Sequence, residues 1–457
     1  MALDFSNLHG RYAKYFVTQT RCCAEQAREY LQGLVQADKK NILRMSEVVP
    51  DTDEQRLEHF IAESPWAEGP VIEQVARDVD RLLGGRPEST LILDESGQPK
   101  KGRKSVGVAR QWLGRLGKVD NGQVGVYASL SSEPGVSLVN ARLFLPQQWT
   151  KDPPRCEAAG VPSERIKEHR SKSQLALEMV QQNRQWGQRF NWVGADSFYG
   201  ADNAFLVGLE ASGERFVVDS PKDRLVYLEP PRPVVPPPSP GGGRPPSRLH
   251  AQSPGIRVDQ LAAQQPPQAW QKLTIRSTTK EPLIVEVFHR RVWFWDGETA
   301  AGVYLWHLLV RREALPEGGY DYKYSLSNAE PTTPVLTLAQ QQARRFWVER
   351  TLEDAKGQAG MADYQVQGWR GWHHHMTLVM MTMLFLLEQR IQHHETDPLL
   401  SCRDLMLLLS RLLPRQDLTY EEILRQVEAR HQRRQAAMAS AQKRAHAKIL
   451  AANSDSS

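Results

Sequence analysis

Apolar positions recur every three or four residues along the N-terminal part of the chain. CAEQAREYLQGLVQ (23–36) and VIEQVARDVDRLL (71–83) both follow this pattern, which is typical of amphipathic helices. GGRP (84–87) then ends the last of them. The pattern predicts a helical domain over residues 1–87. Two roles fit such a domain: DNA binding through a helix-turn-helix, and helical packing or dimerisation.

From residue 88 the apolar positions come in short β-rich runs, and extended and helical patterns then alternate. The extended runs lie at 89–94, 122–130 and 137–145, followed by a helix at 171–189, a strand ending at Asp196, a helix at 201–210 and a strand at 215–220. The order β-β-β-α-β-α-β is that of an RNase H-like core that still lacks its last helix. We therefore predict the α/β fold class with an RNase H-like catalytic core.

The missing helix is expected much later in the chain. Thr337 followed by Gln340 has the pattern of a capping box, and residues 338–356 continue with helical periodicity. Residues 221–335 would then be an insertion. Its segment 230–246 contains nine prolines and three glycines, which favours an extended loop over a helix or a central strand. Runs such as LIVEVF and RVWFW follow and predict a small antiparallel β subdomain.

Two more helices are expected near residues 372–390 and 399–413, and the tail from Glu421 is amphipathic and basic. The predicted organisation has five parts. These are a helical N-terminal domain (1–87), the first part of the RNase H-like core (88–220), the Pro-rich loop and β-rich insertion (221–335), the last helices of the core (336–395) and a helical basic C-terminal region (396–457).

Composition limits the compartment and the partners. The 58 Lys and Arg against 53 Asp and Glu give a net charge of +5, which permits a nucleic-acid partner without requiring one. Four cysteines without a CxxC pair exclude a disulfide scaffold and a Cys-rich zinc site. The longest apolar run, 376–387, is shorter than the roughly 20 residues that span a bilayer. We therefore expect a cytoplasmic protein that does not bind a membrane.

Acidic side chains stand at the ends of two predicted strands. Asp94 closes LILD, Asp196 closes WVGAD, and Glu349 lies on the late helix. Together these carboxylates could hold two Mg²⁺ ions, which prefer oxygen ligands. Two ions about 4 Å apart stabilise the attacking and leaving oxygens of a phosphoryl transfer. Arg345 and Lys356 lie four residues before and seven after Glu349, on the same helix face, where they could bind phosphate oxygens.

Neighbouring acids leave alternatives open. Glu95 adjoins Asp94, but successive strand side chains point to opposite faces, so only one of the two should face the site, and we prefer Asp94. Glu353, one turn after Glu349, is the alternative ligand on the late helix. A surface helix laced with ion pairs is the other interpretation of that helix. Asp120 is interpreted as a turn residue and Asp202 as a capping residue.

A basic loop and two tryptophans add candidate DNA contacts. The loop PKKGRKS follows the first strand and would neutralise backbone phosphates there; the alternative is a solvated hairpin loop. Its cations are Lys100, Lys101, Arg103 and Lys104. Trp295 and Trp369 are interpreted first as core residues, and stacking on an unpaired base is the alternative for both.

Three long motifs together resemble one known family. They are LILDESGQPKKGRKSVGVARQWLGRLGKVDNGQVGVY, GADSFYG and WVERTLEDAKGQAGMADYQVQGWRGWHHHMTL. They are similar to bacterial insertion-sequence transposases of the DDE superfamily, especially those with a β-rich insertion between the second Asp and the Glu. The resemblance covers roughly residues 88–390. It implies that Asp94, Asp196 and Glu349 bind two catalytic Mg²⁺ ions, for which Mn²⁺ can substitute. In the family signature Tyr-x2-Arg-x3-Glu-x6-Lys, Arg345, Glu349 and Lys356 match, while Gln342 stands in place of Tyr.

The resemblance also implies a function. Such an enzyme cleaves DNA at the inverted-repeat ends of an element and transfers the freed 3′-hydroxyl strand into target DNA, without a covalent protein–DNA intermediate. It implies a homodimer on DNA and a location at the bacterial nucleoid. Two alternatives remain. One is an inactive or domesticated relative that binds DNA without cutting it; the other is an RNase H-like nuclease without strand transfer.

Overall fold

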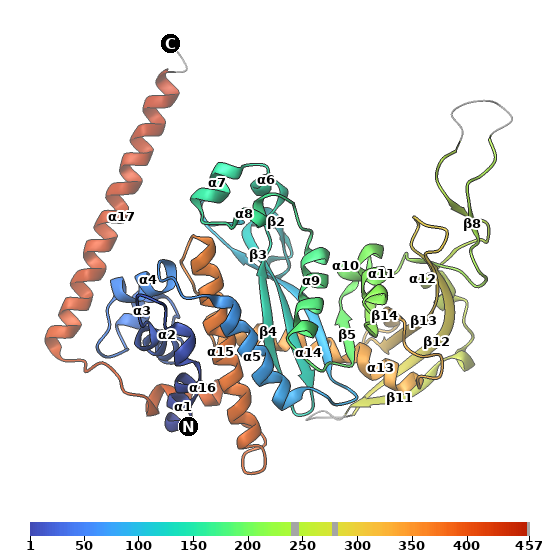
Figure 1. Cartoon of the computed structure of the whole chain (residues 1–457), viewed down its shortest axis with the longest axis horizontal. Helices are drawn as coiled ribbons and strands as arrows, with labels where there is room; N and C mark the ends of the chain where they lie inside the picture. The colour runs from blue at the N-terminus through green and yellow to red at the C-terminus, as the bar shows by residue number, and fades with distance from the viewer. Residues whose placement is uncertain (239–245, 277–281, 455–457) are drawn as a thin grey trace.

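The computed structural model describes residues 1–238, 246–276 and 282–454. The middle of the Pro-rich segment, residues 239–245, lies outside these described residues. Figure 1 shows a central sheet flanked by helices, with the N-terminal helices beside one end of it and the insertion strands at the other end. Within the described ranges, every helix falls short of the length and apolarity that a membrane crossing would need.

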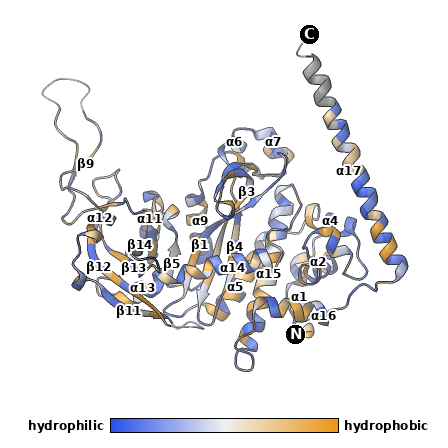
Figure 2. Cartoon of the chain, turned by 180° about the vertical axis from the view of Figure 1, so that it is seen from behind, coloured by the Kyte–Doolittle hydropathy of each residue, from blue (hydrophilic) through white to orange (hydrophobic). Residues whose placement is uncertain are grey.

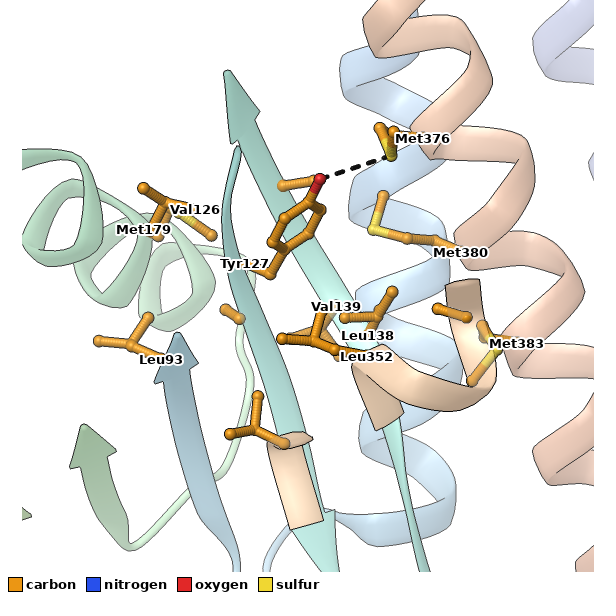
Figure 3. Close-up of a cluster of buried hydrophobic side chains, with 14 of the residues drawn as sticks. Leu93, Val126, Tyr127, Leu138, Val139, Met179, Leu352, Met376, Met380 and Met383 are labelled. Atoms are coloured by element: carbon orange, nitrogen blue, oxygen red, sulfur yellow. Dashed lines mark hydrogen bonds between the residues drawn. The ribbon is translucent and has the colours of Figure 1, made fainter. Parts of the chain in front are cut away.

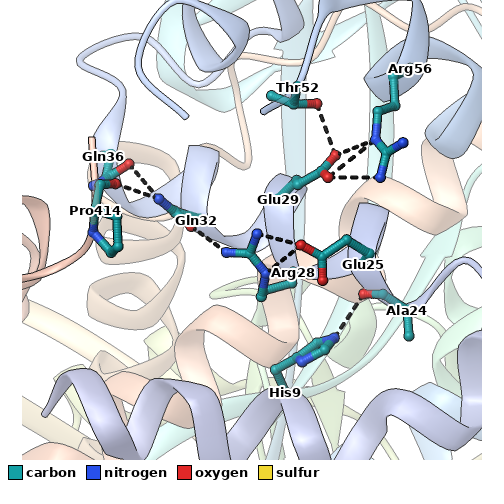
Figure 4. Close-up of polar contacts among 10 residues, drawn as sticks. All are labelled: His9, Ala24, Glu25, Arg28, Glu29, Gln32, Gln36, Thr52, Arg56 and Pro414. Carbon is teal, nitrogen blue, oxygen red and sulfur yellow. Dashed lines mark hydrogen bonds and ion pairs between the residues drawn. The ribbon is translucent and has the colours of Figure 1, made fainter. Parts of the chain in front are cut away.

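Helices fill the N-terminal region, as the apolar spacing predicts. They are α1 (Ala2–Tyr12), α2 (Ala24–Gln36), α3 (Ile42–Ser46), α4 (Glu54–Ala62) and α5 (Glu68–Leu83), with the 3-10 helix η1 (Ala13–Phe16) after α1. Asn41 and Asp53 begin α3 and α4 because their side chains accept the backbone N–H groups of the first turn. Figure 4 shows how polar contacts hold α2 in place: buried Glu29 accepts from Arg56 Nε at 2.8 Å.

One mixed sheet of ten strands forms the centre of the described structure, in the order β11-β12-β13-β14-β6-β5-β1-β3-β2 with β4 paired to β3. β1 is antiparallel to β3 and parallel to β5, and β5 is parallel to β6. Strands that are buried on both faces require nearly continuous apolar runs, and the β1 residues at 91–93 are all fully buried. The core strands are β1 (Thr90–Pro99), β3 (Lys118–Ser132), β4 (Gly135–Leu143), β5 (Trp192–Ala195) and β6 (Phe216–Ser220).

Helices cover both faces of these core strands (Figure 3). On one face, Met179 of α9 (Lys172–Gln185) lies beside Leu93 and Val126. On the other face lie α14 (Phe346–Gly357) and α15 (Trp369–Gln392), where Tyr127 donates to the sulfur of Met376 at 3.7 Å. The connecting helices are α6 (Gln147–Thr150), α7 (Pro153–Ala158), α8 (Ser163–Ile166), α10 (Ser197–Gly200) and α11 (Asn203–Ala211).

The N-terminal helices share one hydrophobic core with the sheet. Phe5 of α1 packs edge-on against Phe385 of α15, with ring centroids 5.6 Å apart. Trp66 stacks on His374 of α15 at 3.7 Å. The same buried cluster continues from α1 through α15 into β1, β3 and β4, and Figure 2 shows the hydrophobic residues along these elements. α15 therefore joins the N-terminal helices to the sheet.

The insertion strands extend the main sheet, whereas the sequence predicts a separate small subdomain. β11 (Gln271–Arg276), β12 (Leu283–Trp295), β13 (Val303–Ala314) and β14 (Tyr320–Ser327) are antiparallel in that order. β14 then pairs with β6, because the outer side of β6 would otherwise be an unpaired edge. Before them lie β7 (Leu225–Val226), β8 (Pro233–Val234), β9 (His250–Ala251), β10 (Ile256–Arg257), α12 (Val258–Ala263) and η3 (Pro267–Ala269).

The hairpin after the basic loop differs from the sequence prediction. β2 (Ala109–Leu113) is not predicted by the pattern, and Asp120, predicted in a turn, lies within β3 opposite Gln111. The chain reverses instead at the 3-10 helix η2 (Gly114–Leu116) and at Gly117, whose φ of 60° suits glycine. Pairing with β2 thus overrides the local turn preference of the DNG sequence.

The late helix is present, but it begins earlier and is interrupted. α13 (Val335–Arg344) starts directly after Pro334, without a side-chain cap, so the capping-box prediction at Thr337 is wrong. Arg345 separates α13 from α14. The C-terminal helices are α16 (Cys402–Leu412) and α17 (Tyr420–Ser454).

Candidate active site

Asp94 and Asp196 occupy corresponding positions on neighbouring parallel strands. Leu93 of β1 is aligned with Ala195 of β5, so the two aspartates are the next pair along. Asp94 does not close its strand, as the sequence pattern suggested, because β1 continues to Pro99. β5 ends instead, and Asp196 caps α10 by accepting from the N–H groups of Phe198 and Tyr199. The pairing of β5 with β1 therefore ends at Ala195, directly before the position of the two carboxylates.

Both aspartates lie on the sheet face that α13 and α14 cover. Side chains alternate along a strand, so Asp94 shares its face with Thr90, which donates to Gln341 of α13 at 2.6 Å. Asp196 shares its face with Trp192, which packs in the cluster that contains Leu338 of α13. α13 therefore covers the face on which both aspartates stand, and α14, which carries Glu349, follows it directly in the chain.

The two carboxylates are poorly solvated and repel each other. Burial raises the pKa of Asp94 to about 7, and the negative charge of Asp196 adds to this shift. Burial also raises the pKa of Asp196, and the negative charge of Glu95 is the next largest contribution to this increase. A cation placed between such carboxylates would offset both their poor solvation and their mutual repulsion.

Arg345 forms ion pairs with two acids next to this group. Its Nη1 contacts Oε1 of Glu349 at 2.8 Å, and its Nε contacts Oδ2 of Asp219 at 3.0 Å. Burial lowers the pKa of Arg345, but nearby carboxylates more than offset this effect and the pKa is raised. These carboxylates are Asp219, Glu349, Asp94 and Asp196. The guanidinium therefore lies within the field of all four acids.

Glu349 is the most exposed of the three predicted ligands, with 52% of its side chain accessible. In the described residues, no group of three or more His, Cys, Asp or Glu side chains is arranged to hold a metal ion. The structure thus brings Asp94 and Asp196 together and ties Glu349 to Arg345. The donor set nevertheless suits Mg²⁺, which binds through one or two carboxylates and retains several waters.

The two alternative acids are paired with other cations, although the charge of Glu95 still affects Asp196. Glu95 faces the opposite side of the sheet and contacts Lys172 Nζ of α9 at 2.6 Å, as strand alternation requires. Glu353 is 71% exposed and pairs with Arg350 at 3.0 Å. The geometry therefore favours Asp94 and Glu349 over their neighbours.

The predicted phosphate-binding cations differ in accessibility. Burial lowers the pKa of Lys356, and the charge of Asp94 opposes this shift. Lys356 also lines a small cavity together with Tyr127, the residue opposite Asp94 on β3. Lys101, Arg103 and Lys104 are exposed. Lys100 is turned inward instead: it lies 3.5 Å from the ring centre of Tyr364 and donates to the carbonyl of that residue at 3.0 Å. Lys100 is thus engaged by the protein, unlike the other three.

The two tryptophans that were candidates for base stacking also differ. Trp369 is 9% exposed and its ring lies 4.2 Å from that of His373, so it packs in the core and little of its ring is accessible to a base. Trp295 is half-buried at the end of β12, where its Nε1 donates to the carbonyl of Thr299 at 2.8 Å. Only Trp295 keeps an accessible ring.

Sequence reasoning missed Asp219, although a signal was present. RFVVDS is a predicted strand that carries an acid near its end, the same pattern that singled out Asp94 and Asp196. In the structure Asp219 lies near the end of β6, the parallel neighbour of β5, and binds Arg345.

Comparisons with known proteins bear on the same region. The family model of the DDE superfamily endonucleases matches residues 14–282, a range that includes Asp94, Asp196 and Asp219 but ends before Glu349. A probable transposase for insertion sequence element IS701 from Microchaete diplosiphon is 30% identical over 196 residues, which cover 42% of this chain and 47% of that relative. The match thus spans about half the length of this curated relative.

A solved structure was also found. The cryo-EM structure of the piggyBac transposase synaptic complex with hairpin DNA aligns with 88% of this chain and 75% of its own, at 10% identity and a TM-score of 0.36. The family model, in contrast, covers more than half of the chain. The chain belongs to the DDE superfamily endonucleases.

Proposed function

We propose that this chain is a DNA transposase, which cleaves DNA at the inverted-repeat ends of an element and joins the freed strand to target DNA. One observation carries the proposal. Asp94 and Asp196 stand side by side on two parallel strands, on the face covered by the helices that provide Arg345 and Glu349. This is an acidic site next to cations, as metal-dependent phosphoryl transfer requires.

We further propose that the catalytic domain is RNase H-like. The strand order β4-β3-β1-β5-β6, with β3 antiparallel and β5 parallel to β1, supports this fold, and α13 and α14 would complete it. We also propose the domain boundaries at 87, 220, 335 and 395, which divide the chain according to its order of helices and strands. The strands that extend the sheet beyond β6 would be the β-rich insertion.

Two Mg²⁺ ions held by Asp94, Asp196 and Glu349, or Mn²⁺ in their place, would activate the nucleophile and stabilise the leaving oxygen. The protein's own side chains position the DNA. Lys356, which lines a cavity with Tyr127 opposite Asp94, would bind a phosphate beside the carboxylates. The exposed cations of the basic loop would neutralise backbone charge further along the strand. Trp295 offers a partly open ring for an unpaired base.

The proposed function also suggests roles for the other parts of the protein. The N-terminal helices would recognise the element ends, and a homodimer would bring two ends together. A protein that acts on DNA would work in the cytoplasm at the nucleoid. An inactive relative would bind the ends without cutting them, and an RNase H-like nuclease would cut without joining.

The test is a cleavage and strand-transfer assay in Mg²⁺ or Mn²⁺ with DNA that carries the inverted repeats flanking the gene. The wild-type protein should cut at the repeat boundary and join the product to a second DNA. D196N should bind the same DNA but neither cut nor join it. D202N is the matched control, because Asp202 only caps α11 and asparagine is an equally good cap. Binding without cutting by the wild type would favour the inactive relative, and cutting without joining would favour the nuclease.

A further inference from the structure

Asp219 is a carboxylate with no assigned role that lies beside the proposed metal site, because Val218 is aligned with Ala195 and Asp219 is therefore level with Asp196. It stands near the end of β6, and 14% of its side chain is accessible. Its Oδ2 forms an ion pair with Arg345 Nε at 3.0 Å. A largely buried carboxylate is costly unless it is paired and hydrogen-bonded, so its position is specified by these partners.

A chain of contacts fixes this carboxylate from the other side. β14 pairs with β6 so that Ser325 lies opposite Asp219, and its hydroxyl donates to Asp219 Oδ1 at 2.6 Å. Gln342 of α13 donates in turn to the hydroxyl of Ser325 at 2.7 Å. The buried amide, the hydroxyl and the carboxylate thus form one relay that ends at the guanidinium of Arg345.

The relay determines where Arg345 can lie. Asp219 binds the Nε edge of the guanidinium, and Glu349 binds Nη1 at 2.8 Å. Arg345 is therefore shared between Asp219, which we call its anchor, and Glu349, one of the proposed metal ligands. Without the anchor, the guanidinium would be drawn fully to the acids of the site, because opposite charges attract strongly where water is scarce. It would then compete with a metal ion for the same carboxylates.

We propose that Asp219 is a positioning residue that anchors Arg345, so that the guanidinium contacts only Oε1 of Glu349 and the remaining oxygens of Glu349, Asp94 and Asp196 are left to a divalent cation. The proposal rests on the function proposed above, because it requires that these three acids bind the metal. It assigns no metal contact to Asp219. Ser325 and Gln342 support the anchor through hydrogen bonds alone.

The experiment measures Mn²⁺ binding to the purified full-length protein by titration calorimetry, without DNA. Loss of a side chain that orients metal-site groups typically weakens metal affinity about 10- to 100-fold, and we expect this range for D219N. S325A keeps the carboxylate but removes one of its hydrogen bonds, so it should weaken binding by a smaller factor. D321N is the matched control, because Asp321 is an exposed acid on the same strand as Ser325; its Mn²⁺ affinity should equal that of the wild type.

A double variant separates positioning from charge. If Asp219 acts through Arg345, D219N should lose most of its effect on Mn²⁺ affinity in an R345Q background. An equal effect of D219N in both backgrounds would overturn the proposal, since Asp219 would then act on the metal by itself. Unchanged Mn²⁺ affinity in both D219N and S325A would also overturn it.

The same titration distinguishes this failure from failure of the proposed function. If the wild type binds Mn²⁺ and D219N binds it equally well, only the role of Asp219 is refuted. If the wild type does not bind Mn²⁺, the metal site itself is refuted. If D219N does not fold, S325A carries the test, because the serine hydroxyl is a smaller loss and the ion pair to Arg345 remains.

Discussion

Replacing Asp94 with asparagine should stabilise the metal-free protein while it abolishes the proposed activity. The pKa of Asp94 is raised from 3.8 to about 7, mainly by burial. At 1.36 kcal/mol per pKa unit, this shift corresponds to about 4 kcal/mol of folding free energy. The value is an upper estimate for D94N, because the asparagine amide must also leave water.

The direction of the pH dependence of stability follows from whether the folded or the unfolded state binds the proton more tightly. The folded protein holds the Asp94 proton up to about pH 7, whereas the unfolded chain releases it near the ordinary value of 3.8. Stability contributed by protonated Asp94 is therefore complete below about pH 4 and is lost as the pH rises to about 7. Above that pH both states are ionised, and the penalty stays constant. D94N should lack this pH-dependent loss.

The assay is thermal unfolding in EDTA between pH 4 and 8. With roughly 2.1 cal/mol/K of unfolding entropy per residue, cooperative unfolding of the 457-residue chain converts about 4 kcal/mol into about 4 °C. The Tm of D94N should therefore exceed that of the wild type by up to about 4 °C at pH 8, and the difference should shrink towards pH 4. Mg²⁺ should raise the Tm of the wild type only. D120N, which changes a surface aspartate, is the control. A Tm difference between D94N and wild type that does not vary with pH would refute the reasoning.

Three further predictions follow from the site. E349Q should abolish DNA cleavage while E353Q leaves it nearly unchanged, because Glu353 pairs outward with Arg350; a cleavage assay that ranks them in the opposite order would reassign the ligand. K356A should weaken DNA-end binding and reduce the slope of log K against log salt by about 0.9, as expected for one lost phosphate contact. K101A should likewise lower the salt slope in a binding titration, whereas K100A should leave the slope unchanged and lower Tm, because Lys100 binds Tyr364.

The strands of the core could be predicted because each is a short apolar run between clear breaks. The same patterns could not show which edges would meet. The insertion strands were predicted as an antiparallel unit, but the pairing of β14 with β6 depends on an unpaired edge elsewhere in the chain. β2 was missed for a related reason. Its pairing with β3 outweighs a local sequence that favours a turn around Asp120.

The late helix shows the limit of local signals at helix ends. The Thr337 pattern resembles a cap, yet Pro334 starts the helix, since a proline with φ near −60° is already compatible with a helix start. The break at Arg345 has no sequence signature. The guanidinium of Arg345 contacts Asp219 and Glu349, so the break between α13 and α14 coincides with these tertiary contacts.

The candidate site was predictable as far as its chemistry depends on one side chain at a time. Strand alternation alone separates Asp94 from Glu95, and the Lys172 contact of Glu95 agrees with it. Asp219 could not be assigned in this way, because its role depends on the side chains that surround it. It has the same sequence pattern as Asp94 and Asp196, but it faces Arg345 and Ser325. A carboxylate that faces other carboxylates creates a demand for a cation, whereas one that faces a guanidinium already has its counter-charge. Equal positions on parallel strands therefore lead to different chemistry, and the difference arises only from the helix and the inserted strand that cover them.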